Sequence, residues 1–112
     1  QKVKELVTKT IARGAEIVSL LGSGSAYFAP SAAIAELVEA VAKDEKKNLG
    51  VSAYLNGEYG IKNICTGVVC RIGRQGIEKI IELELNQEES QAFANSAESI
   101  RKNLELLKAY GI

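Results

Sequence analysis

Residues 49–85 read LGVSAYLNGEYGIKNICTGVVCRIGRQGIEKIIELEL, and this segment holds three short runs, of which the first and third alternate apolar and polar residues and the middle one is largely apolar. A period of two residues is typical of β-strands. The runs are separated by Asn56-Gly57, the dipeptide that a tight two-residue hairpin prefers, and by residues 73–76, which read GRQG. Because strands joined by such short turns pair antiparallel, we predict a three-stranded antiparallel meander.

The three runs differ in how many of their faces are apolar. The middle run, residues 64–72, has Cys65 and Val69 on one face and aliphatic residues on the other. Apolar residues on both faces are typical of a strand in the middle of a sheet. The third run, residues 77–85, carries glutamates on one face, which predicts burial of the other face only.

Helical periodicity surrounds these runs. Apolar residues recur every three or four positions in residues 2–21, and an alanine-rich helical pattern has Pro30 in its first turn. After the third run, Asn86 and Glu89 have the spacing of a capping box, and an amphipathic pattern follows to about residue 110. The sequence therefore predicts an α+β fold with two N-terminal helices, the meander and a long C-terminal helix.

Composition and charge limit the possible partners. The chain has 112 residues, 46% of them hydrophobic, so we expect residues 1–112 to form one compact domain. Its 14 basic and 14 acidic side chains cancel, which leaves no long-range field to attract nucleic acid or an anionic membrane. No apolar run reaches the roughly 18–20 residues needed to span a bilayer, and the charged start is unlike a secretory signal. We expect a soluble, cytoplasmic protein.

The residue types exclude several kinds of catalytic site. The chain has no histidine, which removes histidine-based metal sites and imidazole-based catalytic triads. Cys65 and Cys70 are five residues apart in one predicted strand, so their side chains point to opposite faces and should not form a disulfide. Two small buried hydrophobic residues in a reducing compartment explain them more simply than a redox or nucleophilic role. The glutamates at 78, 82 and 84 lack complementary metal ligands and are best explained as a solvent-facing strand surface.

Three polar segments are candidates for ligand contact. Residues 22–25 read GSGS between two predicted helices, where backbone N–H groups and serine hydroxyls could bind an anion, although a plain helix–helix connection explains them as well. Arg71 and Arg74 flank a turn and could bind a carboxylate or simply be solvated. Glu58-Tyr59 follows the first turn, where a structural role is the simpler interpretation.

Four segments match a known family in order and spacing. Residues 14–21 read GAEIVSLL, residues 24–30 GSAYFAP, residues 54–62 YLNGEYGIK, and residues 73–85 GRQGIEKIIELEL. Together they resemble the C-terminal region of the lactate/malate dehydrogenase family, especially its lactate-dehydrogenase-like malate dehydrogenases. The resemblance implies the same α+β fold and, in the complete protein, NAD-dependent conversion of (S)-malate to oxaloacetate.

The resemblance also implies that the main functional groups lie elsewhere. The family's catalytic His, the Asp that orients it, the substrate-binding arginines and the glycine-rich nucleotide fingerprint have no matching position in this chain. We therefore expect no catalytic residue and no metal ligand here. The chain is expected to be the substrate-side part of a longer protein, inactive alone, with NAD bound mainly by a missing N-terminal nucleotide-binding Rossmann domain.

Residues 24–30 resemble the family segment that lines the substrate pocket. The resemblance makes Ser25 and Ala26 candidates for the pocket wall around a small dicarboxylate, and Pro30 a candidate for the wall on the nicotinamide side. These residues and Tyr27 resemble those of malate dehydrogenases rather than lactate dehydrogenases. The position that mainly distinguishes the two substrates in this family lies on a mobile loop outside this chain. One departure is Val69, where many such malate dehydrogenases have proline, and it concerns strand geometry.

Other readings stay open. The chain could be a lactate dehydrogenase fragment, a non-catalytic interaction domain that kept the dehydrogenase scaffold, or a small anion-binding module that uses the glycine-serine loop. The resemblance implies a homo-oligomer. A domain separated from its partner half is expected to expose apolar surface and to self-associate.

Overall fold

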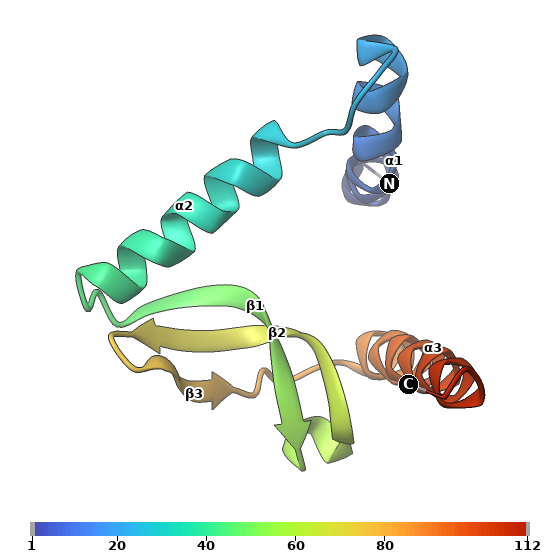
Figure 1. Cartoon of the computed structure of the whole chain (residues 1–112). Coiled ribbons are helices and arrows are strands. Elements are labelled where there is room, and N and C mark those ends of the chain that lie inside the picture. Colours follow the sequence, from blue (N-terminus) through green and yellow to red (C-terminus); the bar gives the residue numbers. More distant parts are fainter. Residues whose placement is uncertain (1, 112) are drawn as a thin grey trace. The chain divides into compact units, whose positions relative to one another are not determined.

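A computed structural model describes residues 2–111, apart from the side chain of Ala109. The elements follow in this order (Figure 1): helix α1 (Lys2–Leu21), helix α2 (Phe28–Ala42), strand β1 (Lys47–Asn56), the 3-10 turn η1 (Glu58–Gly60), strand β2 (Lys62–Gly73), strand β3 (Gly76–Ile81) and helix α3 (Gln87–Ala109). The predicted fold is confirmed: two helices, a three-stranded antiparallel sheet in the order β1-β2-β3, and a long final helix.

The chain divides into two compact units, Gln1–Val38 and Glu39–Ile112. The first unit contains α1, the connecting loop and most of α2. Helix α1 is amphipathic as predicted, with a 2.8 Å ion pair between Arg13 and Glu16 on its polar side. None of its described residues is buried, and apolar side chains such as Val3, Leu6 and Ile11 are exposed.

The second unit is built on the pairing of β1 with β2. Leu55 lies opposite Ile64, and Leu49 lies opposite Cys70, so their side chains share one face of the sheet. Leu55 and Cys70 have no exposed surface, which places the centre of the core on this face. Strand β2 lies between β1 and β3, as its sequence predicted.

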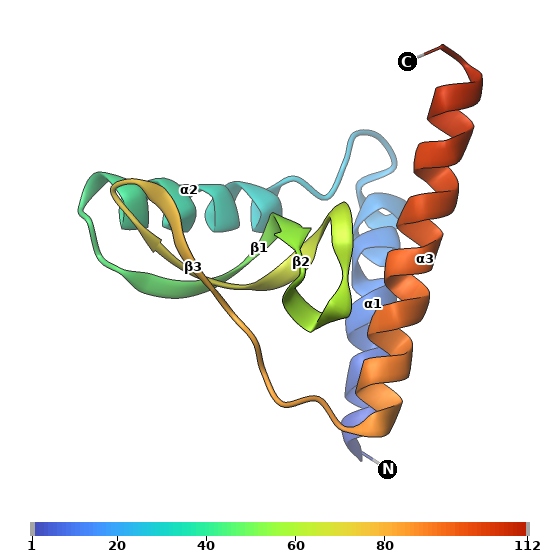
Figure 2. The same ribbon diagram turned by 90° about the horizontal axis from the view of Figure 1, so that it is seen from below.

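Two alanines mark where helices come close to this core. Ala40, near the end of α2, and Ala97, in α3, are both fully or almost fully buried. Helix α3 contacts β2 and lies beside the end of the sheet where β1 passes into β2 (Figure 2). Small side chains at these two positions allow the helix backbones to approach the core closely.

The opposite face of β2 differs from the prediction. Cys65 and Gly67 are exposed and Val69 is half-buried, whereas residues on the core face of the same strand are buried. The expectation that both cysteines are buried is therefore wrong for Cys65 and correct for Cys70. The sequence pattern identified which side chains share a face, but no described element covers the second face at Cys65 and Gly67.

The connection between β1 and β2 is longer than the predicted two-residue turn. Gly57 has a φ of 141°, and its N–H donates to the carbonyl of Ile61 at 2.9 Å. The 3-10 turn η1 fills the space between them, with Tyr59 at a φ of 54°. The carboxylate of Glu58 accepts the N–H of Asn56 at 2.7 Å, so Glu58 stabilises the turn, as its structural interpretation predicted.

Tyr59 also explains why β3 ends at Ile81 rather than at the predicted Leu85. Its hydroxyl donates to the carbonyl of Ile81 at 3.1 Å and accepts the N–H of Leu83 at 2.8 Å. Its own N–H donates to the carboxylate of Glu82 at 2.6 Å, and its ring meets Phe93 edge-on with centroids 5.0 Å apart. This Tyr59 clamp (Tyr59, Ile81, Glu82, Leu83 and Phe93) takes the place of further strand pairing.

The start of α3 confirms the predicted capping box. The side-chain oxygen of Asn86 accepts the N–H of Glu89, and the Glu89 carboxylate accepts the N–H of Asn86, both at 2.9 Å. Two N–H groups that the helix cannot satisfy are therefore paired.

The first prediction concerns the hydroxyl of the Tyr59 clamp. Replacing Tyr59 by Phe keeps the ring on Phe93 but removes the partners of the Ile81 carbonyl and the Leu83 N–H. We expect the free energy of unfolding to fall by about 1–2 kcal/mol, measured by urea denaturation. The control is Tyr54→Phe, which removes an exposed 3.0 Å hydrogen bond to Asn63 and should cost less than about 0.5 kcal/mol. Equal losses in the two variants would contradict this assignment.

The second prediction concerns the two thiols. Cys65 is exposed, and burial raises the pKa of the Cys70 thiol, so a thiol reagent should modify Cys65 in the folded protein and Cys70 only after unfolding. A raised pKa in the folded state means that this contribution to stability is complete below the ordinary thiol pKa of about 8.5 and is lost as the pH rises above it. The difference in stability between the wild type and Cys70→Ala should accordingly shrink above that pH. Rapid modification of both thiols in the folded chain would refute the prediction.

Candidate functional site

The loop between α1 and α2 and the first turn of α2 hold the three residues predicted to contact substrate and cofactor. Helix α1 ends where the N–H of Gly22 donates to the carbonyl of Val18 at 3.2 Å. Gly24 has a φ of 90°, a conformation that favours glycine. The N–H of Tyr27 then donates to the carbonyl of Ser25 at 2.8 Å, which closes a tight three-residue turn before α2 begins.

The structure places the three predicted residues close together along this loop. Ser25 is exposed, Ala26 is half-buried, and Pro30 lies exposed in the first turn of α2. Proline suits that position because its ring sets a helical φ and its missing N–H would have no partner there. Ser25 and Pro30 are thus accessible on a short segment with a defined backbone.

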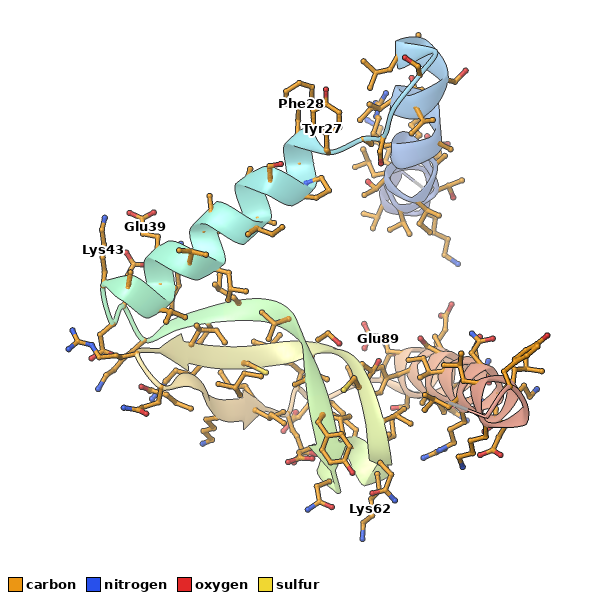
Figure 3. The ribbon with its side chains drawn as sticks, in the orientation of Figure 1. Tyr27, Phe28, Glu39, Lys43, Lys62 and Glu89 are labelled. Carbon is orange, nitrogen blue, oxygen red and sulfur yellow. The ribbon has the colours of Figure 1, made fainter. Side chains whose placement is uncertain are left out.

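Two aromatic residues that sequence reasoning did not single out for contact lie on the same segment. Tyr27 and Phe28 project from the start of α2 (Figure 3), and their ring centroids are 4.7 Å apart. Their exposed fractions are 53% and 70%, although aromatic side chains usually contribute to cores. Two adjacent aromatics among small residues were the available sequence signal.

The start of α2 offers few donors for an anion. The N–H of Tyr27 already binds Ser25, and Pro30 has no N–H. The hydroxyl and the N–H of Ser31 both donate to the carbonyl of Tyr27, at 2.7 and 2.9 Å. Only the N–H groups of Phe28 and Ala29 are left in the first turn, which argues against a dedicated anion-binding module.

This loop does not form a dinucleotide cradle. A dinucleotide site of the Rossmann type needs a strand before its glycine-rich loop, whereas this loop follows helix α1. Within residues 2–111, no group of three Asp, Glu or Cys side chains could hold a metal ion. The segment can therefore form part of a pocket wall, but it supplies no proton acceptor and no site for the pyrophosphate of NAD.

The other polar candidates lie in the second unit. Arg71 is exposed on β2 opposite Lys79, and the backbone N–H of Arg74 donates to the carboxylate of Asp44 at 2.8 Å. The Asp44 carboxylate thus stabilises the turn by binding a backbone N–H, which supports a structural role for this region. Glu82 is exposed, as expected, and its carboxylate also accepts the N–H of Tyr59 in the Tyr59 clamp. Glu58, in η1, accepts hydrogen bonds from its own backbone and from the backbone of Asn56, and these bonds lower the pKa of its carboxyl group.

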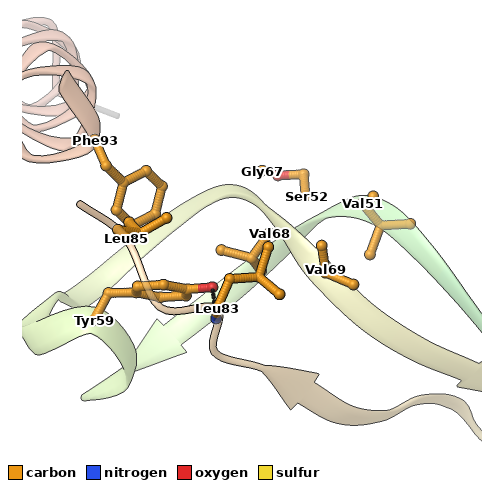
Figure 4. A pocket seen from close by; sticks show the side chains of 10 residues that line it. Val51, Ser52, Tyr59, Gly67, Val68, Val69, Leu83, Leu85 and Phe93 are labelled. Atoms are coloured by element: carbon orange, nitrogen blue, oxygen red, sulfur yellow. Dashed lines mark hydrogen bonds between the residues drawn. The ribbon is translucent and has the colours of Figure 1, made fainter. Parts of the chain in front are cut away.

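The sheet carries an apolar cavity of about 430 Å³, which we name the sheet groove (Figure 4). Its lining comes from β1, η1, β2, the segment after β3, and α3. The lining residues are Gly50, Val51, Ser52, Tyr59, Gly67, Val68, Val69, Leu83, Leu85 and Phe93. None of them is charged. Val69, where many malate dehydrogenases of this family have proline, lines the groove. It lies in the central strand opposite both Gly50 and Ile81.

Within the part of the chain that the structure describes, no helix combines the length and apolarity needed to cross a membrane.

Comparison with known proteins identifies the family. Residues 1–110 match the model of the lactate/malate dehydrogenase alpha/beta C-terminal domain. The chain is 50% identical over 107 residues to a malate dehydrogenase of Halalkalibacterium halodurans, covering 96% of this chain but 34% of that protein. The chain therefore spans about a third of the length of this curated relative.

Solved structures agree in both sequence and fold. The malate dehydrogenase of Cryptosporidium parvum superposes with a TM-score of 0.92 at 39% identity, over 96% of this chain and 34% of that one. A lactate dehydrogenase of Eimeria maxima, solved with NADH and oxamate, superposes with a TM-score of 0.84 at 42% identity, with the same coverage of 96% and 34%. From the family match, the sequence identity and the shared fold, we conclude that the chain belongs to the lactate/malate dehydrogenase family and corresponds to its alpha/beta C-terminal domain.

Proposed function

We propose that this chain is the substrate-side C-terminal domain of an NAD-dependent malate dehydrogenase, which interconverts (S)-malate and oxaloacetate when complete. The observation that carries the proposal is the match of residues 1–110 to this domain together with 50% identity to a malate dehydrogenase. The chain contributes about a third of the length of such an enzyme, and the activity belongs to the whole protein.

Residues of the α1–α2 loop would form part of the pocket wall. Ser25 and Ala26 would line the space for a small dicarboxylate, and Pro30 would face the nicotinamide side. The tight turn at Ser25 and the fixed φ of Pro30 support this role, because a wall that positions a substrate must hold its own backbone geometry. Ala26 has no polar atom on its side chain, so its contribution would be shape.

The cofactor would be held mainly outside this chain. The loop lacks the preceding strand of a dinucleotide cradle, so we assign NAD binding to an N-terminal Rossmann domain beyond these residues. The chain also lacks histidine, so the histidine that the resemblance implies as proton acceptor would come from that other part. Alone, the 112 residues would be inactive. The complete protein would be a cytoplasmic homo-oligomer.

Malate is favoured over lactate as the substrate. The Eimeria maxima lactate dehydrogenase is 42% identical to this chain, so the fold does not separate the two substrates. The support for malate is the local sequence Ser25-Ala26-Tyr27 and Pro30, and the 50% identity to a malate dehydrogenase.

A chimeric enzyme tests the proposal. The part of the Halalkalibacterium halodurans malate dehydrogenase that precedes its matched segment would be joined to this chain. We expect the chimera to oxidise NADH with oxaloacetate in preference to pyruvate, and the 112-residue chain alone to show no turnover, because it supplies neither a proton acceptor nor a nucleotide cradle. Absorbance at the NADH band measures both rates.

A substitution in the loop tests the pocket wall in the same chimera. Ala26→Leu should reduce kcat/KM for oxaloacetate by roughly tenfold or more, because a larger side chain would enter the substrate space. Glu88→Gln, at an exposed position in α3, should leave kcat/KM unchanged. A folded chimera with no dehydrogenase activity would count against the proposed function and favour a non-catalytic interaction domain, and clear turnover by the chain alone would refute its predicted inactivity.

A further inference from the structure

The turn after β1 contains the one asparagine of the sequence that is followed by glycine. Six asparagines occur in the chain, and the other five precede Leu, Ile, Gln or Ser. An asparagine side chain is converted to an acid when the backbone nitrogen of the next residue attacks it. Glycine hinders this attack least, because it has no side chain. The pair Asn56-Gly57 is therefore the asparagine site that the sequence protects least.

The structure leaves this pair accessible to water. Asn56 and Gly57 are both exposed at the end of the β1–β2 hairpin. The pairing register shifts between Leu55 and Asn56, so Asn56 lies beyond the regular ladder of the two strands. The water that the conversion consumes can thus reach the Asn56 side chain.

The turn nevertheless restrains the attacking atom. The N–H of Gly57 donates to the carbonyl of Ile61 at 2.9 Å, and the carbonyl of Gly57 accepts the N–H of Gly60 at 3.0 Å. The Gly57 nitrogen must give up its proton and turn toward the Asn56 side chain before it can react, and the bond to Ile61 opposes both. The reaction therefore requires local opening of η1.

We propose that Asn56 is a site of spontaneous deamidation and that the opening of η1 sets its rate. In the opened turn, the Gly57 nitrogen attacks the Cγ atom of Asn56. The new bond joins that nitrogen to Cγ, the bond from Cγ to Nδ2 breaks, and Nδ2 leaves as ammonia with the proton from the Gly57 nitrogen. Water then opens the cyclic imide at either carbonyl, which gives aspartate or isoaspartate without any oxidation or reduction. This inference is independent of the proposed function.

The isoaspartate product would disturb the turn itself. Its main chain runs through the former side-chain carbon of Asn56, which adds one carbon before Gly57 and displaces the Gly57 N–H from Ile61. It also leaves a new carboxylate beside that of Glu58, which binds the N–H of residue 56 at 2.7 Å, and the two like charges repel. Tyr59 lies within η1. Isoaspartate at position 56 would therefore loosen the Tyr59 clamp.

Peptide mass spectrometry during incubation at neutral pH tests the proposal. The folded 112-residue chain is compared with a synthetic peptide of residues 52–62, which has no sheet to hold η1. We expect Asn56 to convert faster than Asn95, whose side chain is bonded to Gln91 within α3, but slower than in the peptide by roughly tenfold or more. Conversion no faster than that of Asn95, or as fast as in the peptide, would overturn the inference.

Two variants separate the turn from general exposure. Glu58→Ala removes the carboxylate that holds the Asn56 N–H, so Asn56 should convert faster by roughly threefold or more. Glu84→Ala, at an exposed position between β3 and α3, is the matched control and should leave the rate unchanged. Urea denaturation establishes that each variant is folded. Equal rates in the two variants would refute control by the turn.

Hydrogen exchange measures the opening in the unmodified chain, without any substitution. The same opening frees the Gly57 N–H for exchange and its nitrogen for attack. The slowing of conversion relative to the peptide should therefore match the exchange protection of the Gly57 N–H. Strong protection with no slowing would overturn the inference.

The stability of the products tests the effect on the Tyr59 clamp. The isoaspartate form, separated by chromatography, should unfold at a lower midpoint than Asn56→Asp. That variant carries the same added charge without the extra main-chain carbon, so it is the matched control. Equal midpoints would contradict loosening of the clamp.

Discussion

The burial of one face of the β1–β2 pair is the constraint on which the second unit depends. Leu55 and Cys70 are completely buried on that face, and Ile64 and Ile72 almost completely. Since side chains alternate along a strand, fixing this face also fixes which residues point the other way. A register shift of one residue would move Gly67 and Cys65 into the core and expose Ile64 and Val68. The open face is a direct consequence of the covered one.

Periodic patterns in the sequence predicted the elements well, because each element depends on neighbours along the chain. The period of two residues predicted the first and third strands, the apolar run between them predicted the middle one, and the spacing of Asn86 and Glu89 predicted a cap that the structure contains. The errors lie where distant residues act. Strand β3 ends early because Tyr59, more than 20 residues away in the sequence, binds the carbonyl of Ile81 and the N–H of Leu83. A local rule for Asn-Gly turns also misses η1, which positions Tyr59 for those bonds.

The candidate site shows a different limit. The sequence identified the loop at Ser25 as a polar connection, but its proposed role came only from the likeness to a family. Hydrogen bonding at the start of α2 then argued against anion binding there, because Pro30 and Ser31 leave few N–H donors free. Sequence reasoning predicted a buried Cys65, since an apolar pattern shows which residues share a face but not whether anything lies over it. The glycines at 50 and 67 were not distinguished either, because their empty surroundings are visible only in three dimensions.

The meander also bears on the order in which such a protein would assemble. Each strand of the second unit pairs with the next strand in the chain, and connections of this kind have low contact order. Folds dominated by sequence-local pairing reach their native state quickly, because little chain entropy is lost in closing each loop. The sheet can therefore form without contacts from more distant segments, and Gly50 and Gly67 then lie exposed on it.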